Sequence, residues 1–409
     1  MNVLVLATFL FTYAGMAVGR LPGLRIDRAG IALIAVAILL AGGAIDTGFL
    51  ARAVDAPTLV LLFGLMVVSA QFAHSGFYAA CADRIVRSPL SPRGLLAVTV
   101  AVSGGLSAIL VNDIVVFAMT PLLVVGLRQR RLDPRPFLLG LAAASNVGSA
   151  ATVIGNPQNI LLGQLGDLGF WRFVGVCGVP AVLSLVVVYA VIAWLWRAAL
   201  QAGAGVPEPG AAPAIDRWQV TKALLATTAV IVLLSTPVPR EVGVLAIAAL
   251  LLASRHTSSR AMLAAVDWPL LLLFACLFTV TAAMADTGLV AGALAWLEDA
   301  GYAPTRLGVI APMALLMSNT IGNVPAVVML TALRPDLSTG ALYALALLST
   351  LAGNFLIVGS IANLIVAERA QAAGVRLSFA DFARAGMPIT VVTMVLGVGW
   401  LAATGVLPL

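Results

Sequence analysis

Residues 93–127 read RGLLAVTVAVSGGLSAILVNDIVVFAMTPLLVVGL, an apolar stretch interrupted near its middle by Ser, Asn and Asp. A helix needs only about 20 residues to cross the core of a bilayer. Because this stretch is too long for one crossing, we predict a re-entrant hairpin of two half-helices. Such a break is tolerated at membrane depth only where the backbone is buried in protein or lines a cavity. A second stretch, at 304–333, has the same character and is predicted to form a second hairpin.

The rest of the chain is equally apolar. Of its 409 residues, 61% are hydrophobic and only 10% are charged, a composition that excludes a water-soluble protein. The three cysteines are scattered and fit neither a disulfide framework nor a zinc site. Ten further apolar blocks are predicted to cross the membrane, at about 2–19, 29–48, 56–77, 136–163, 172–197, 217–235, 239–254, 268–287, 338–367 and 385–407.

Arginine placement tests the hairpin interpretation. If both hairpins return to the side they entered from and the N-terminus is outside, the cytoplasmic loops hold 18 of the 23 basic residues. This asymmetry follows the positive-inside rule, whereas counting each hairpin as a crossing would spoil it. We therefore expect a multi-pass protein of the bacterial inner membrane with both termini periplasmic. The net charge of +6 comes from arginines in short loops, which set the orientation of the protein in the membrane, so no nucleic-acid partner is expected.

The chain also repeats itself. The stretch Val54-Asp55-Ala56-Pro57 recurs 212 residues later as Val266-Asp267-Trp268-Pro269, and Asn112 in the first hairpin matches Asn323 in the second at an offset of 211. Beyond the hairpins, Asn159 matches Asn363 at an offset of 204. Each repeat holds five crossings, an odd number, so the second must be inverted relative to the first. We predict an all-α fold of two inverted repeats, 1–200 and 217–409, joined by a cytoplasmic linker at 201–216.

Chemistry is expected where polar residues interrupt apolar blocks, because unsatisfied polar groups there are costly. Where such polar residues are accompanied by Gly and Pro, we predict broken helices. The N-terminal amides of a broken helix attract anions, and its freed carbonyls attract cations. Small polar residues also serve close helix packing, and that alternative applies to any single serine. The candidate residues for substrate or ion binding are Asn112, Asp113, Ser149, Thr152, Asn156, Asn159, Asn323, Asn354, Ser360 and Asn363.

Asp113 stands apart as the carboxylate placed deep in a membrane block. It is a candidate for proton coupling or cation coordination. The alternative is that it caps the second half-helix of the hairpin. Both interpretations stay open here. No metal centre is expected; Na⁺ is a candidate ligand of Asn112, Asn159, Asn323 and Asn363.

Several motifs carry a resemblance to a known family. They are Asn112-Asp113-Ile114 running to Thr120-Pro121, the run GSAATVIGNPQN at 148–159, Asn323-Val324-Pro325, and Gly353-Asn354 followed by Val358-Gly359-Ser360 and Asn363. Together they resemble the arsenite-permease/NhaD family of the ion transporter superfamily, over about 25–407. The resemblance implies an elevator-type or related alternating-access carrier with its site between two opposed hairpins, and a homodimer as one candidate assembly.

The departures from this family bear on the substrate. Dicarboxylate carriers of the superfamily place Ser-Asn-Thr at each hairpin tip, whereas the same register here gives Val111-Asn112-Asp113 and Gly322-Asn323-Val324. We therefore expect proton-coupled efflux of a small inorganic oxyacid or oxyanion, of the arsenite or silicic-acid type. Sodium-coupled import of an anion or dicarboxylate and sodium/proton antiport are the alternatives. An enzyme is not expected, since neither histidine lies deep; nor is any cofactor other than H⁺ or Na⁺ as coupling ion.

Overall fold

The computed structural model describes residues 2–18, 26–201, 214–289 and 306–409, and within these ranges the chain is helical and contains no strand. Five described helices are long and apolar enough to cross a membrane, judged by length and composition: Ala56–His74, Pro92–Ile109, Phe170–Leu195, Trp268–Asp286 and Phe379–Ala403. The helices of the first half are α1 (Asn2–Val18), α2 (Arg28–Ala41), α3 (Thr47–Ala53), α4 (Ala56–His74), α5 (Phe77–Arg87), α6 (Pro92–Ile109), α7 (Asn112–Gln129), α8 (Arg135–Ser149), α9 (Pro157–Leu165), α10 (Phe170–Phe173) and α11 (Val179–Leu195). Those of the second half are α12 (Arg217–Leu233), α13 (Arg240–Leu252), α14 (Ser259–Ala264), α15 (Trp268–Asp286), α17 (Leu307–Thr320), α18 (Asn323–Leu333), α19 (Thr339–Ala352), α20 (Ile361–Ala372) and α21 (Phe379–Ala403).

Both predicted hairpins form helix pairs with short tips. In the first, α6 and α7 are separated only by Leu110 and Val111; in the second, α17 and α18 are separated by Ile321 and Gly322. The second tip needs glycine, because Gly322 has a φ of +95°, a conformation that L side chains rarely adopt. The predicted range 93–127 fits α6 and α7 to within two residues, while the first two positions of 304–333 lie outside the described residues.

Two helices are broken, as the polar runs predicted. The chain leaves α8 at Ser149 and re-enters a helix at Pro157, and it leaves α19 at Ala352 and re-enters one at Ile361. Gly155 and Pro157 mark the first break, since Pro157 fits the first turn of α9 and cannot continue a preceding helix. A short 3-10 turn, Ile357–Gly359, lies within the second break. The backbone groups freed at these breaks need other partners.

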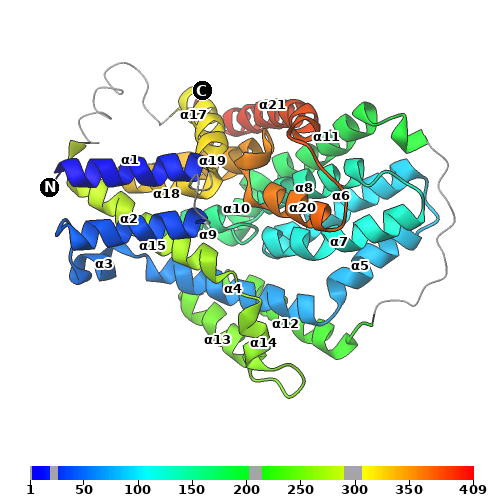
Figure 1. The fold of residues 1–409 in the computed structure, drawn as a ribbon, viewed down its shortest axis with the longest axis horizontal. Helices are drawn as coiled ribbons and strands as arrows, with labels where there is room; N and C mark the ends of the chain where they lie inside the picture. The colour runs from blue at the N-terminus through cyan, green and yellow to red at the C-terminus, as the bar shows by residue number, and fades with distance from the viewer. Residues whose placement is uncertain (1, 19–25, 202–213, 290–305) are drawn as a thin grey trace.

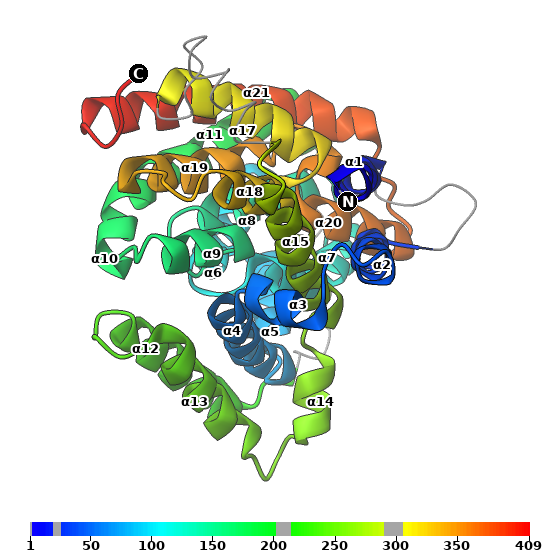
Figure 2. The ribbon, with the colours of Figure 1, turned by 90° about the vertical axis from the view of Figure 1, so that its left-hand side faces the viewer.

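The broken helices and hairpins occupy the middle of the molecule. Figure 2, turned by 90° from Figure 1, places α8, α18 and α20 at the centre, with α12, α13 and α14 at one edge, where α4 packs against them. Figure 1 shows α4 running away from the end that holds the N-terminus, whereas α15 runs toward it. The predicted linker 201–216 falls mostly on residues outside the described ranges.

Very close packing joins the first hairpin to the first broken helix. A Cβ on Gly148 of α8 would lie 2.0 Å from the backbone oxygen of Gly104 on α6. Only glycine allows two backbones to approach this closely, as in other membrane helix pairs. The contact therefore fixes α6 against α8 and sets the height of the hairpin tip relative to the break.

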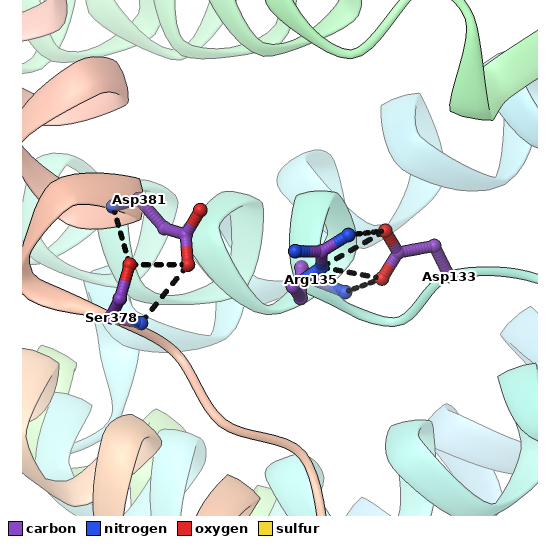
Figure 3. Close-up of polar contacts among 4 residues, drawn as sticks. All are labelled: Asp133, Arg135, Ser378 and Asp381. Carbon is purple, nitrogen blue, oxygen red and sulfur yellow. Dashed lines mark hydrogen bonds and ion pairs between the residues drawn. The ribbon is translucent and has the colours of Figure 1, made fainter.

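The starts of α8 and α21 are held by local polar contacts, which Figure 3 shows. Arg135 forms an ion pair of 2.8 Å with Asp133 at the start of α8. At the start of α21, Ser378 and Asp381 form a capping box, each side chain bonding the backbone of the other. The helices α8 and α21 also contact each other. These contacts lie at the end of the molecule that arginine placement predicts to be cytoplasmic.

Candidate functional site

Two equivalent asparagines close the two helix breaks. The Asn159 side-chain amide donates to the carbonyl oxygens of Ser149 and Thr152, at 3.1 and 3.0 Å. The Asn363 amide donates to the carbonyl oxygens of Gly353 and Leu356, at 2.9 and 3.3 Å. Each carbonyl of the second loop lies 204 positions beyond its counterpart in the first. The breaks are thus the same structure built twice, held by an amide in the helix that follows.

The second half of each broken helix begins with a polar cap. Asn156 accepts from the Asn159 amide nitrogen at 2.9 Å and donates to the Ser149 hydroxyl at 2.9 Å. At the equivalent position, Ser360 accepts from the Ala362 amide nitrogen at 3.3 Å. Both caps are buried, so two helix N-termini with partial positive charge lie inside the protein.

A residue outside the predicted set joins the two halves. Asn146 of α8 donates to the side-chain oxygens of Asn354, at 2.8 Å, and Asn363, at 3.0 Å. Its own oxygen accepts from the Ser360 hydroxyl at 2.8 Å. Thr350, at the equivalent position of α19, accepts instead from Asn156 at 3.2 Å and from Gln158 at 3.1 Å. The repeat pairs Asn146 with a threonine, so the sequence did not mark it as a site residue.

Replacing Asn146 with leucine should destabilise the protein by about 2–4 kcal/mol, because three buried polar groups on α20 and the preceding loop lose their partner. Thr320→Ala is the matched control, since the Thr320 hydroxyl is exposed and bonds only to its own helix. Thermal unfolding of the two detergent-purified variants measures the difference. Equal midpoints would show that the Asn146 network contributes nothing to stability.

The first hairpin tip lies against the first break. The Asn112 backbone amide donates to the Gly155 oxygen at 3.3 Å, and the Thr152 hydroxyl donates to the Ala108 carbonyl at the end of α6. The side-chain oxygens of Asn112 and Asn159 are buried and have no hydrogen-bond donor among the described residues. Carbonyl-type oxygens of this kind suit a cation or a polar solute.

The second tip is arranged differently. The Asn323 side-chain oxygen accepts from the Val324 amide at 3.0 Å, so the asparagine bonds its own helix. The neighbouring Asn319, which lies before the tip, donates to Ala352 O at 2.9 Å and accepts from Leu356 N at 3.1 Å. Asn319, not Asn323, therefore ties the second hairpin to the second break, a role that the sequence did not indicate.

Asp113 lines a cavity of about 440 Å³ between α4, α7 and the start of α15. The interpretation of Asp113 as a helix cap is wrong: α7 begins at Asn112, the cap position is Val111, and no side chain caps this helix. Within the described ranges, the carboxylate has no hydrogen bond or ion pair, and it is 8% exposed. It is thus free to exchange a proton or bind a ligand in the cavity.

A second carboxylate lines the same cavity. Asp267, which precedes α15, accepts from the Leu270 amide at 3.0 Å, and burial raises the pKa of its carboxyl above the ordinary value. The sequence places it at a helix start, where a capping aspartate is ordinary. Only the fold brings Asp267 to the first hairpin. The sequence indicated one deep carboxylate, Asp113, whereas the cavity is lined by two.

Another cavity, of about 400 Å³, lies beside the first. It also reaches Asp267 and is lined by Arg28 and by α20 from Ile361 to Glu368. Both cavities contact the starts of α2 or α15, at the end that arginine placement predicts to be cytoplasmic. Across the described ranges, no three His, Cys, Asp or Glu side chains converge as a metal site would require.

All ten predicted site residues are buried, with none more than 8% exposed. The structure brings Asn112, Ser149, Thr152, Asn156 and Asn159 together at the first break. It also brings Asn354, Ser360 and Asn363 together at the second, joined to the first through Asn146. Asp113 faces the cavity, and Asn323 has no side-chain hydrogen bond to the other nine.

Comparison with known proteins places this architecture among transporters. A family model described as citrate transporter (CitMHS) matches residues 13–338. A 46 kDa membrane protein of Mycobacterium leprae is 29% identical, covering 97% of both chains. The silicon efflux transporter LSI3 of Oryza sativa is 26% identical, covering 92% of this chain and 93% of that one. The YdaH transporter of Alcanivorax borkumensis superposes with a TM-score of 0.56 at 16% identity, over 98% of this chain and 97% of that one.

Proposed function

This chain belongs to the citrate transporter family, a family of multi-pass membrane transporters within the ion transporter superfamily predicted from its motifs, and we propose that it carries a small oxyacid or oxyanion by alternating access. The transport is secondary: a proton or sodium gradient drives it. The protein moves its substrate and does not transform it, in keeping with relatives named as transporters. Export coupled to proton entry is the mode that the site supports best.

One observation carries this proposal: the two helix breaks have the same hydrogen bonds at positions 204 apart, and cavities open beside them at one end. The helices α4 and α15 are both 19 residues long, begin after a capping aspartate, and run in opposite directions (Figure 1). These features support two inverted repeats, each with five crossings and one hairpin. In such carriers the site lies where the repeats meet.

The chemistry of the buried set favours a neutral or weakly acidic solute. Of the ten candidate residues, only Asp113 carries a charge, and the others offer amides and hydroxyls. A multiply charged carboxylate would require cationic partners that this set lacks, since an uncompensated buried charge is costly. Helix N-termini at Asn156 and Ser360 can each bind one oxygen of an oxyacid. A relative named as a silicon efflux transporter is consistent with such a solute.

Flux into proteoliposomes tests the proposal. We expect an imposed pH gradient to drive uptake or release of silicic acid or arsenite, and citrate, succinate and sulfate to be carried poorly. Empty liposomes and a valinomycin-clamped membrane potential are the controls. If neither silicic acid nor arsenite moves faster than in empty liposomes under a proton or a sodium gradient, the proposed substrate class is wrong. If none of the five solutes moves, the proposed transport is wrong as well.

Sodium coupling is the second candidate, favoured by the side-chain oxygens of Asn112 and Asn159, which accept no hydrogen bond from the described part of the chain. Sodium would bind these oxygens and stabilise the native state in proportion to its occupancy. A rise in unfolding temperature with Na⁺ but not with choline would favour this candidate over proton coupling. Sodium/proton antiport gains support from Asp267, which supplies a second carboxylate to the cavity of Asp113.

The assembly and placement follow from the same proposal. We place the protein in a bacterial inner membrane with both termini on the periplasmic side, since this puts the arginine-rich loops in the cytoplasm. Both cavities then open inward. A homodimer is the assembly that the family resemblance implies, and chemical cross-linking in native membranes tests it.

A further inference from the structure

We propose that Arg240 and Arg28 are alternating latches, each of which fastens a broken helix to the surrounding helices when its own side of the carrier is closed. The inference rests on the proposed alternating-access function and names the residues that hold its end states. Arg28 begins α2 and Arg240 begins α13, and they are 212 positions apart, the same offset that relates α4 to α15. They are therefore repeat equivalents at opposite ends of the molecule.

Arg240 is engaged in this structure. Its guanidinium donates to the Gly163 carbonyl at 2.8 Å and forms an ion pair of 2.8 Å with Asp167. Both partners lie at the end of α9, and only 14% of the Arg240 side chain is exposed. The adjacent Glu241 accepts from Gln164 of α9 at 3.3 Å. The start of α13 thus clamps the end of the first broken helix.

Arg28 is not engaged in the equivalent way. It has no hydrogen bond or ion pair with a described residue and lines the cavity of about 400 Å³ beside α20. Its Nη1 atom lies 3.9 Å from the point that a Cβ on Gly322 would occupy, so the side chain extends toward the second hairpin tip. Between Arg28 and α20 there is thus a cavity, whereas between Arg240 and α9, the equivalent elements of the other half, the contact is closed.

The partner for Arg28 is already present on α20. Applying the 204-residue offset, Gln164 of the clamped helix corresponds to Glu368, which lines the same cavity as Arg28. The acidic residue occupies different positions in the two halves. Beside Arg240 it is the adjacent Glu241, which bonds Gln164 of α9, whereas beside Arg28 it is Glu368, on the facing helix α20. When this cavity closes, Arg28 and Glu368 meet with opposite charges, while Arg240 releases Gly163 and Asp167.

This exchange predicts how each residue shifts the balance between the two states. A ligand or contact shifts such an equilibrium only through its difference between the states. Losing Arg240 removes contacts made only in the present state, so the carrier moves toward the closed-cavity state. Losing Glu368 removes a contact made only in that other state, so it opposes the shift.

Cysteine labelling in the cavity measures the balance directly. In a variant with Cys81, Cys177 and Cys276 replaced, Leu364→Cys places a thiol in the cavity one turn from Glu368. A membrane-impermeant maleimide is added to inside-out vesicles. We expect Arg240→Ala to slow labelling about tenfold, the factor expected from one charge-assisted hydrogen bond. Adding Glu368→Gln to Arg240→Ala should restore the original rate.

Matched variants keep the result interpretable. Arg52→Ala removes a cation from the same side as Arg240 and should leave labelling unchanged, while the swap Arg28→Glu with Glu368→Arg should again slow labelling in the Arg240→Ala background. If Arg240→Ala is not recovered as folded protein, Asp167→Asn removes the ion pair alone and should give a smaller slowing. Unchanged labelling in both, or slowing that persists with Glu368→Gln, overturns the latch. Labelling needs no substrate, so the two proposals can fail separately. If a solute is transported but Arg240→Ala leaves labelling unchanged, the latch is wrong and the proposed function stands. If labelling slows as expected but no solute is transported, the proposed function is wrong and the latch stands.

Discussion

Replacing Asp113 with asparagine should abolish proton-driven exchange, lowering its initial rate by about a hundredfold or more, as expected when a proton-transfer group is removed. The carboxylate lines the cavity, has no partner among the described residues, and sits next to Asn112 at the first hairpin tip. Asparagine has nearly the same shape but cannot take up a proton. Flux driven by a pH gradient in proteoliposomes is the measurement.

The matched control is Asp55→Asn. Asp55 caps α4 as Asp267 caps α15, and asparagine caps a helix equally well, so this variant should transport normally. Asp267→Asn should lower the rate less than Asp113→Asn does, because its carboxylate is held by the Leu270 amide. Proton-driven exchange that persists undiminished in Asp113→Asn would exclude Asp113 as the coupling group.

Replacing Gly148 with alanine should destabilise the protein by about 1–3 kcal/mol or more, the usual range for overpacking. The added Cβ would meet the backbone of Gly104 at 2.0–2.5 Å, and a backbone cannot rotate out of the way as a side chain can. The added methyl group should push the hairpin away from α8. The expected result is a lower unfolding temperature, measured by intrinsic fluorescence in detergent.

Gly105 supplies the control, since a Cβ there has no atom of the described residues within 4 Å. Gly105→Ala should leave the unfolding temperature unchanged or raise it slightly, because alanine restricts the unfolded chain. If both glycine variants unfold at the same temperature, close approach of α6 and α8 is not what holds the hairpin in place.

The sequence predicted the hairpins and helix breaks because their signals are local. Polar residues and Gly or Pro in long apolar blocks mark a place where a helix cannot continue, and the repeat then pairs each mark with a second one. The helices α3, α5 and α14 were not among the predicted blocks, because they are too short or too polar to be read as membrane crossings.

Contacts between halves could not be predicted in the same way. Asn146 bonds partners 208 and 217 positions away, and Asp267 lines a cavity formed by distant helices. The repeat pairs Asn146 with a threonine and Asp267 with the capping Asp55, so neither pairing indicated a contact between the halves. Asn323 shows the opposite error: the repeat pairs it with Asn112, yet its side chain bonds the adjacent amide, and Asn319 makes the long-range contact. Symmetry in sequence predicts position better than it predicts partners.

The loops at the two helix breaks are closed by asparagines only seven to ten residues away along the chain. Each loop therefore carries within itself part of the contacts that fold it, beside those that Asn146 and Thr350 make across the halves. A solute that reached these loops would meet the same amides and hydroxyls from either face of the membrane. Such a carrier is reversible by construction: the gradients on its two sides, and not the protein, decide whether it fills the cell or empties it.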